Sequence, residues 1–224
     1  GTFLSNEYSL PSAALSLSLY NRKAPYLHLM DALTPEEGAL AVRLARSVLD
    51  HAIGGKPEAV LDLPPVFREK RGVFVTLTVH GELRGCIGFP YPHMALEKAI
   101  RDAAYAAARE DPRFPPVEKG ELPRIRIEVT VLTVPMLLGA DPLDRPRAVQ
   151  VGRHGLIVRG FGRSGLLLPQ VPVEWKWDSR EFLDHTCMKA GLPAGCWKQK
   201  GVEVFTFEGQ IFREPLRHEG GREW

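Results

Sequence analysis

With 224 residues, 44% of them hydrophobic and 25% charged, the chain has the composition of a globular protein and can bury one substantial core, or one core with a smaller lobe. Its formal net charge of +2 argues against a strongly electrostatic nucleic-acid binder, but not against a local basic patch. The sequence has no apolar run of about 18 residues and no signal-peptide layout, so we expect a soluble, cytoplasmic protein with no part in a membrane.

The first secure element in chain order is a helix over residues 34–52. Thr34, Pro35 and Glu37 combine an N-cap, a first-turn proline and the glutamate of a capping box. Apolar residues recur at helical spacing after this start, and two glycines follow the end of the pattern. Residues 1–33 lack a clear period, so we expect an N-terminal extension outside the domain. The chain starts at Gly1 without a Met, which suggests a trimmed tag or an expression boundary in part of this extension.

Residues 72–79 and 83–88 are two extended runs around a short glycine-containing loop at 80–82, the pattern of a β-hairpin. The register that matches the apolar faces gives the partners Val73–Phe89, Val75–Ile87, Thr76–Cys86, Thr78–Arg84 and Val79–Leu83. Arg84 and Cys86 then point the same way, and a guanidinium beside a thiol lowers the pKa of that thiol. The alternative is a small buried cysteine packed between strands, with glycines that ease a bend or bulge.

A second helix is expected from about residue 93 to residue 109, and an Asp-Pro-Arg sequence at 111–113 ends it. Residues 124–134 are the clearest strand, in which isoleucine and valine alternate with polar residues that include Glu128. The polar face of this strand is either the wall of a binding site or the solvated face of an antiparallel sheet.

The C-terminal half begins with three short strands in a meander, at residues 148–151, 155–159 and 165–171. The turn between the last two fits Gly-x-Gly-x-x-Gly, but a strand-like leucine run follows it instead of a helix, so we reject a dinucleotide site there. A helix then starts at Asp178 with another capping box, and a closing strand spans residues 202–212.

The three cysteines are Cys86, Cys187 and Cys196. An odd count without a close pair predicts neither a disulfide framework nor a zinc site, and we expect no metal and no other cofactor. Cys187 lies on the inner face of the last helix and Cys196 is next to Trp197, so we expect both to be packing residues.

The sequence Leu-Arg-Gly-Cys-Ile-Gly at 83–88 resembles the signature of the AMMECR domain family, named from the Alport, midface hypoplasia and elliptocytosis chromosomal region. Similar blocks occur at residues 111–116, 127–132, 154–157, 165–171 and 182–192. The similarity covers about residues 34–214 and leaves 215–224 as a polar tail. It implies an α+β fold, with a mostly antiparallel sheet, about three main helices, and a larger and a smaller lobe. It also implies association with radical-SAM proteins and with Memo-like proteins, but no settled reaction.

One hypothesis is an enzyme, or an enzyme subunit, that acts in a polar cleft on a small anionic or nucleotide-like substrate. Cys86 is the candidate nucleophile, His154 the candidate base, and Glu128 the residue that orients the base or binds a substrate group. The expected ligand-binding residues are Arg84, Gly85, Gly88, Thr76, Arg113 and Gln170. No sequence spacing brings His154 near Cys86, so an exposed turn histidine is the alternative at that position.

The other hypothesis is a non-catalytic adaptor that binds a nucleotide, a nucleic acid or a partner protein. In that case Arg84 and the glycine backbone hold the ligand, and Cys86 has no chemical role. The sequence leaves open whether the protein is an enzyme and in which oligomeric state it works.

Overall fold

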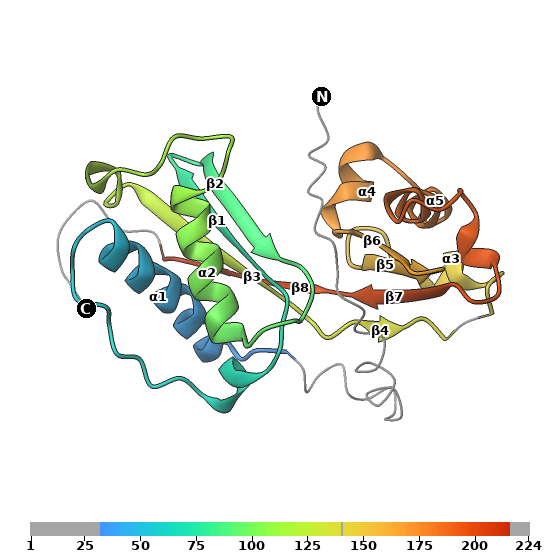
Figure 1. Cartoon of the computed structure of the whole chain (residues 1–224), viewed down its shortest axis with the longest axis horizontal. Helices are drawn as coiled ribbons and strands as arrows, with labels where there is room; N and C mark the ends of the chain where they lie inside the picture. The colour runs from blue at the N-terminus through green and yellow to red at the C-terminus, as the bar shows by residue number, and fades with distance from the viewer. Residues whose placement is uncertain (1–31, 140, 216–224) are drawn as a thin grey trace.

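The computed structural model describes residues 32–139 and 141–215, which form two lobes side by side along the long axis of the molecule (Figure 1). The larger lobe contains α1 (Pro35–Ala52), the 3-10 turn η2 (Pro65–Arg68), β1 (Val73–Val79), β2 (Glu82–Phe89), α2 (Leu96–Arg109), η3 (Lys119–Glu121), β3 (Ile125–Leu132) and β8 (Gly209–Arg213). The smaller lobe contains β4 (Met136–Leu137), α3 (Arg145–Ala148), β5 (Gly155–Gly160), β6 (Arg163–Leu167), α4 (Gln170–Trp175), α5 (Ser179–Lys189), η4 (Cys196–Lys198) and β7 (Glu203–Phe207).

Each lobe is built on its own antiparallel sheet of four strands. The strand order is β2-β1-β3-β8 in the larger lobe and β4-β7-β5-β6 in the smaller lobe. Three of the described helices, α1, α2 and α5, are longer than two turns. The α+β fold with two lobes is therefore confirmed, although the single sheet we expected is divided in two.

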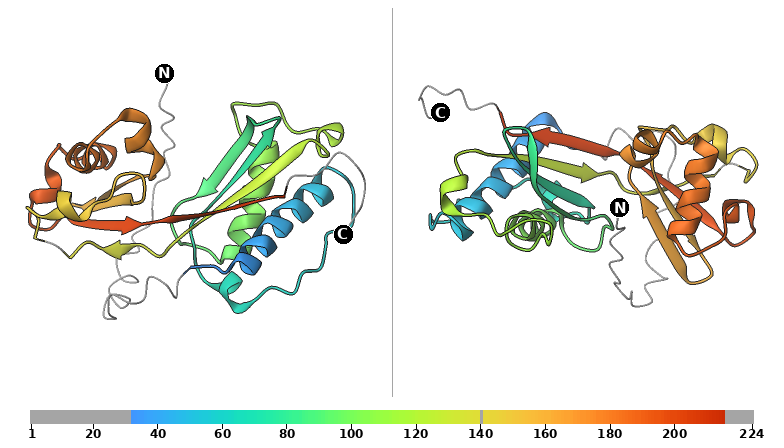
Figure 2. Two further views of the ribbon diagram at one scale, coloured as in Figure 1. Left: turned by 180° about the vertical axis from the view of Figure 1, so that it is seen from behind. Right: turned by 90° about the horizontal axis from the view of Figure 1, so that it is seen from above.

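The two long helices of the larger lobe pack on one face of its sheet (Figures 1 and 2). Alternate residues of the central strands, such as Val75 and Val129, are fully buried against them. The residues between them, such as Thr76 and Glu128, lie on the opposite face and are partly exposed. The strict alternation in residues 124–134 thus marks a sheet with one covered and one open face.

The predicted helix starts are confirmed where a side chain caps them. The Thr34 hydroxyl accepts a hydrogen bond from the Glu37 N–H at 3.2 Å, and the Glu37 carboxylate accepts one from the Thr34 N–H at 2.8 Å. Asp178 caps α5 in the same way. The second helix begins at Leu96, later than expected, because Ala95 pairs in an isolated bridge with Lys70 and the Leu96 N–H donates to the Glu69 carbonyl.

The predicted closing strand at 202–212 is wrong as a single element. Glu208 separates β7 from β8, and the two strands belong to different sheets. At this crossing the Thr133 N–H donates to the Glu208 carbonyl at 2.8 Å, and the Glu208 N–H donates to the Thr133 hydroxyl at 2.9 Å. The chain therefore passes between the lobes twice, through two neighbouring segments that hydrogen-bond to each other.

The meander predicted in the smaller lobe is partly wrong. The strand expected at 148–151 is absent, because α3 ends there and the N–H groups of Arg153 and His154 both donate to the Gln150 carbonyl. The remaining two strands form the β5–β6 hairpin, and β6 stops at Leu167, ahead of α4. None of the described helices is both long and apolar enough to cross a membrane.

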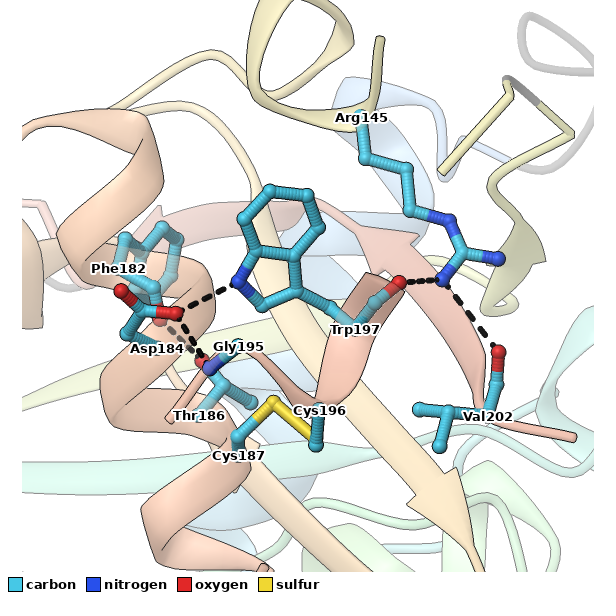
Figure 3. The surroundings of a disulfide bond; sticks show 9 residues. All are labelled: Arg145, Phe182, Asp184, Thr186, Cys187, Gly195, Cys196, Trp197 and Val202. Atoms are coloured by element: carbon cyan, nitrogen blue, oxygen red, sulfur yellow. Dashed lines mark hydrogen bonds between the residues drawn. A yellow bond between two sulfur atoms is a disulfide. The ribbon is translucent and has the colours of Figure 1, made fainter. Parts of the chain in front are cut away.

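Cys187 and Cys196 form a disulfide, which contradicts the prediction that both only pack (Figure 3). Helix α5 ends in a Schellman turn, in which the Leu192 N–H donates to the Cys187 carbonyl and Gly191 has a φ of +71°. This reversal, followed by η4, returns the chain until the two Cα atoms are 5.9 Å apart. The sequence separation of Cys187 and Cys196 does not predict this disulfide, because tertiary packing sets the turn that brings the two residues together.

Two polar side chains, Asp184 and Arg145, hold the segment around the disulfide (Figure 3). The Asp184 carboxylate accepts hydrogen bonds of 2.7 Å from the Gly195 N–H and from the indole N–H of the buried Trp197. The buried guanidinium of Arg145 donates to the carbonyls of Trp197 and Val202. The disulfide is thus one part of a closely tied local structure.

Candidate functional site

The predicted hairpin register is confirmed over most of β1 and β2 and wrong beside the turn. Val73–Phe89, Val75–Ile87 and Thr76–Cys86 are partners as expected, whereas Thr78 lies opposite Leu83 and Val79 lies opposite Glu82. The turn consists of two residues, His80 and Gly81, with φ of +52° and +85°, instead of the expected three. A bulge at Arg84 takes up the extra residue, so the apolar faces beyond it stay aligned.

Four polar residues form a row across the open face of the larger sheet: Cys86 on β2, Thr76 on β1, Glu128 on β3 and Arg213 on β8. Each is the direct cross-strand partner of the next. The Thr76 hydroxyl oxygen is 3.3 Å from the Cys86 sulfur, and the Arg213 Nε donates to the Glu128 carboxylate at 2.8 Å. We call these four residues the polar row. It contains Cys86, Thr76 and Glu128, three of the residues predicted for the site.

The glycines around Cys86 are explained by packing. A Cβ atom on Gly85 would lie 2.1 Å from the carbonyl oxygen of Ala107 in α2. A Cβ atom on Gly88 would lie 2.3 Å from the ring of Phe74. Both positions therefore exclude a side chain, which is a structural reason for glycine without reference to a ligand.

Arg84 is turned toward the segment that precedes β3. Its guanidinium donates to both carboxylate oxygens of Glu121, at 2.8 and 3.0 Å, and to the carbonyl of Pro115 at 2.9 Å. The hydrogen bond to Glu121 raises the pKa of Arg84 and lowers that of Glu121. Its side chain is 14% exposed. The guanidinium thus fastens the bulge to a neighbouring segment and is occupied by a structural ion pair.

Asp111 and Arg113, just after α2, bind the backbone of Cys86. The Cys86 N–H donates to the Asp111 carboxylate at 2.8 Å, and the Arg113 Nη2 donates to the Cys86 carbonyl at 3.1 Å. Because β2 is an edge strand, these groups would otherwise have no partner in the sheet. The hydrogen bond from Arg113, helped by those from the Cys86 and Arg113 N–H groups, lowers the pKa of Asp111 to about 2.

His154 and Gln170 lie in the smaller lobe. The His154 Nδ1 accepts a hydrogen bond of 3.1 Å from the Gln150 N–H, and its Nε2 is 4.0 Å from the Glu208 carboxylate. Gln170 is exposed at the start of α4. Both residues are parts of the smaller lobe, whereas Cys86 is on β2 of the larger lobe. The structure therefore gathers Cys86, Thr76, Glu128 and Arg113, and leaves His154 and Gln170 apart.

Two residues of the site, Asp111 and Arg213, escaped the sequence analysis. The sequence predicts Asp111 only as part of the end of a helix, although an Asp side chain at such a place often accepts a hydrogen bond from a backbone N–H two residues later, as it does here from Arg113. Arg213 follows the last residue of the strand predicted at 202–212, so the alternation in that strand does not predict on which face of the sheet Arg213 lies.

The described residues include no group of three or more His, Cys, Asp or Glu side chains placed to hold a metal ion. A surface cavity of about 370 Å³ lies against the outer side of α2 and a second one of about 210 Å³ lies near the end of α1. Neither is lined by a residue of the polar row. The polar row therefore lies on the open sheet face, outside these two cavities.

Known proteins resemble this chain over most of its length. A family model described as AMMECR1 matches residues 42–212. A protein of Methanosarcina acetivorans is 54% identical over 187 residues, covering 81% of this chain and 94% of the relative. A protein of Methanocaldococcus jannaschii is 50% identical over 189 residues, with coverages of 83% and 94%. The crystal structure of an uncharacterised protein from Pyrococcus horikoshii is 48% identical, with a TM-score of 0.66 and coverages of 81% and 93%.

Proposed function

This chain belongs to the AMMECR1 family, and we propose that it is an enzyme, or a subunit of one, whose nucleophile is the Cys86 thiol. Its substrate in this proposal is a small anionic or nucleotide-like molecule that binds on the open face of the larger sheet. Family membership alone assigns no reaction, so the proposal depends on the residues around Cys86.

One observation carries this proposal: Cys86 has a partly exposed side chain on the open sheet face, next to residues of its segment that have structural roles. Arg84 pairs with Glu121, and both Gly85 and Gly88 are required by close neighbours. Cys86 is also the cysteine outside the disulfide, and it is partly exposed. Its sulfur lies against the Thr76 hydroxyl, which can donate a hydrogen bond to a thiolate.

The chemistry that these residues support is nucleophilic attack by sulfur. The attacking species is the thiolate, which forms when the thiol releases its proton to water. The thiolate forms a bond to an electrophilic carbon of the substrate, and the leaving group departs with the electron pair of the broken bond. The Thr76 hydroxyl stabilises the thiolate before attack. Glu128, held by Arg213, is placed to bind a polar substrate group.

The radical-SAM and Memo-like proteins that the family resemblance implies are, in this proposal, partners of the same site. An open sheet face is accessible to a second protein, which can complete the surroundings of Cys86.

A second candidate is the non-catalytic adaptor, and one observation favours it. Neither of the two surface cavities described above is lined by the polar row, and small substrates usually bind in concave sites. A partner protein or a nucleic acid would bind on the open face without any reaction at Cys86.

Alkylation of the folded protein tests the first proposal. Because the other two cysteines form a disulfide, iodoacetamide uptake reports Cys86 alone. We expect labelling of Cys86 at pH 7.5, mapped by mass spectrometry, at least as fast as that of a free cysteine peptide. Thr76→Val keeps the side-chain shape, removes the hydroxyl and should slow labelling about tenfold or more, since a hydrogen bond to a charged group is lost. Labelling only in denaturant would overturn the proposal.

A ligand screen separates the two candidates. Nucleotides, phosphorylated metabolites and S-adenosylmethionine derivatives are tested by thermal shift on the wild type and on Cys86→Ser. In the enzyme, Cys86→Ser binds the same compounds within about tenfold but turns none of them over, because serine retains the shape and loses the nucleophile. Binding by both proteins with turnover by neither would support the adaptor, and turnover by Cys86→Ser at the wild-type rate would rule out Cys86 as the nucleophile.

A further inference from the structure

We infer that Arg113 selects anionic substrates for this site, with its guanidinium attracting a carboxylate or phosphate group to the thiol of Cys86. Asp111 is the positioning residue that holds this guanidinium in place. The inference rests on the proposed function, because the role of Arg113 is defined relative to the Cys86 thiol.

Asp111 fixes Arg113 through several hydrogen bonds. One carboxylate oxygen accepts from the Arg113 backbone N–H at 3.1 Å and from its Nε at 2.9 Å, and the other accepts from its Nη2 at 2.7 Å. The same Nη2 donates to the Cys86 carbonyl at 3.1 Å. The orientation of the guanidinium is therefore set before any substrate arrives, which reduces the entropy lost on binding.

Asp111 binds the Nε and Nη2 of this guanidinium and leaves Nη1 on the other side, and the Arg113 side chain also contacts the side chain of Cys86. The Arg113 side chain is 44% exposed, whereas the Asp111 side chain is 2% exposed. The ion pair thus has its negative group buried and its positive group at the surface. Although the pair is neutral, an anion that approaches Cys86 meets the exposed guanidinium before the buried carboxylate.

The other charged groups around the polar row are already engaged. Glu128 pairs with Arg213, Arg84 pairs with Glu121, and the Arg126 guanidinium donates to the Glu214 carbonyl. The hydrogen bond from Asp111 raises the pKa of Arg113, and the Cys86 side chain raises it further, so Arg113 stays cationic in the working pH range. Among these groups, the cation bound directly to Cys86 is Arg113, where the sequence pattern suggested Arg84.

Two alkylating reagents of similar size measure this effect: iodoacetate, which is an anion, and iodoacetamide, which is neutral. In both reactions the thiolate sulfur bonds to the methylene carbon, and iodide leaves with the electron pair of the C–I bond. Both reagents use the same thiolate population, so the ratio of their rate constants cancels changes in the thiol pKa and reports the charge near the sulfur.

We expect Arg113→Gln to lower the ratio of the iodoacetate to the iodoacetamide rate constant about three- to fivefold, the size of one charge contact in a mostly aqueous setting. Arg113→Lys should restore most of the ratio, because it returns the charge. Arg84→Gln is the matched control: it removes an equal charge two residues from Cys86 and should leave the ratio unchanged.

A salt titration of the wild type tests the same point without relying on a folded variant. The ratio should fall toward that of a free cysteine peptide between about 10 mM and 1 M salt, as screening shortens the range of the Arg113 charge. A wild-type ratio equal to that of the peptide at low salt would overturn the inference, as would an equal loss in Arg84→Gln. Failure of Cys86 to react with either reagent would instead overturn the proposed function.

Discussion

Breaking the disulfide between Cys187 and Cys196 is expected to destabilise the smaller lobe by about 2.6 kcal/mol. The two cysteines are 9 residues apart in the sequence. In the chain-entropy model, a closed loop of that length removes about 8.6 cal/mol/K from the unfolded chain, which corresponds to about 2.6 kcal/mol at 25 °C. This is roughly an 80-fold change in the folding equilibrium.

Urea unfolding followed by tryptophan fluorescence measures this effect. Trp175, Trp177 and Trp197 belong to the smaller lobe, so their fluorescence reports its unfolding. Both cysteines are fully buried, so the protein is unfolded, reduced, and refolded in the presence of reductant before the titration. The urea midpoint of the reduced protein should be lower by roughly 1–2.5 M, given usual m-values.

A Cys86→Ser variant is the control for this experiment, because Cys86 lies outside the disulfide and its loss should leave the effect of reduction unchanged. Equal midpoints for the oxidised and reduced protein would refute the argument that the bond constrains the unfolded chain. That result would mean that the hydrogen bonds of Asp184, Trp197 and Arg145 hold the turn without the disulfide.

Two further predictions concern the support of Cys86. Gly85→Ala should lower the free energy of unfolding by about 3 kcal/mol in a thermal or urea melt, because the new methyl group would lie 2.1 Å from the Ala107 carbonyl oxygen. Gly120→Ala is the control: a Cβ atom there has no neighbour within 4 Å, so stability should change by less than about 0.5 kcal/mol. Similar costs for the two variants would contradict the close approach of β2 to α2. The lowered pKa of Asp111, about 2, means that its stabilising contribution is complete above about pH 5 and is lost as the pH falls toward 2. Wild type should therefore lose about 2 kcal/mol more than Asp111→Asn over that interval, and parallel pH–stability curves would refute this.

Elements whose signals are local could be predicted from the sequence. The capping boxes at Thr34 and Asp178 each involve residues within one helical turn, and both are confirmed. The alternation in residues 124–134 also predicted β3 and its polar face, since side chains alternate across any strand. Membership of the AMMECR1 family, expected from several sequence blocks, is confirmed as well.

Elements that depend on the other lobe or on a distant turn could not be predicted in this way. Residues 202–212 have one continuous strand-like pattern, but the chain passes from one sheet to the other at Glu208. The alternation of apolar and polar residues is the same whichever strand is the neighbour, so it does not reveal this change. The disulfide is similar, because the distance between Cys187 and Cys196 depends on the Schellman turn and η4, which cysteine spacing does not encode.

The neighbour of the candidate thiol shows how a single residue changes a site assignment. Alternation places Arg84 and Cys86 on one face only while the strand is regular. The bulge at Arg84 interrupts that alternation, and the guanidinium pairs with Glu121. The cation that contacts Cys86 is Arg113, which binds the outward N–H and C=O groups of the edge strand together with Asp111. An edge strand needs partners for those groups, so the search for a charged neighbour is better directed at the segments that cap the edge than at the strand itself.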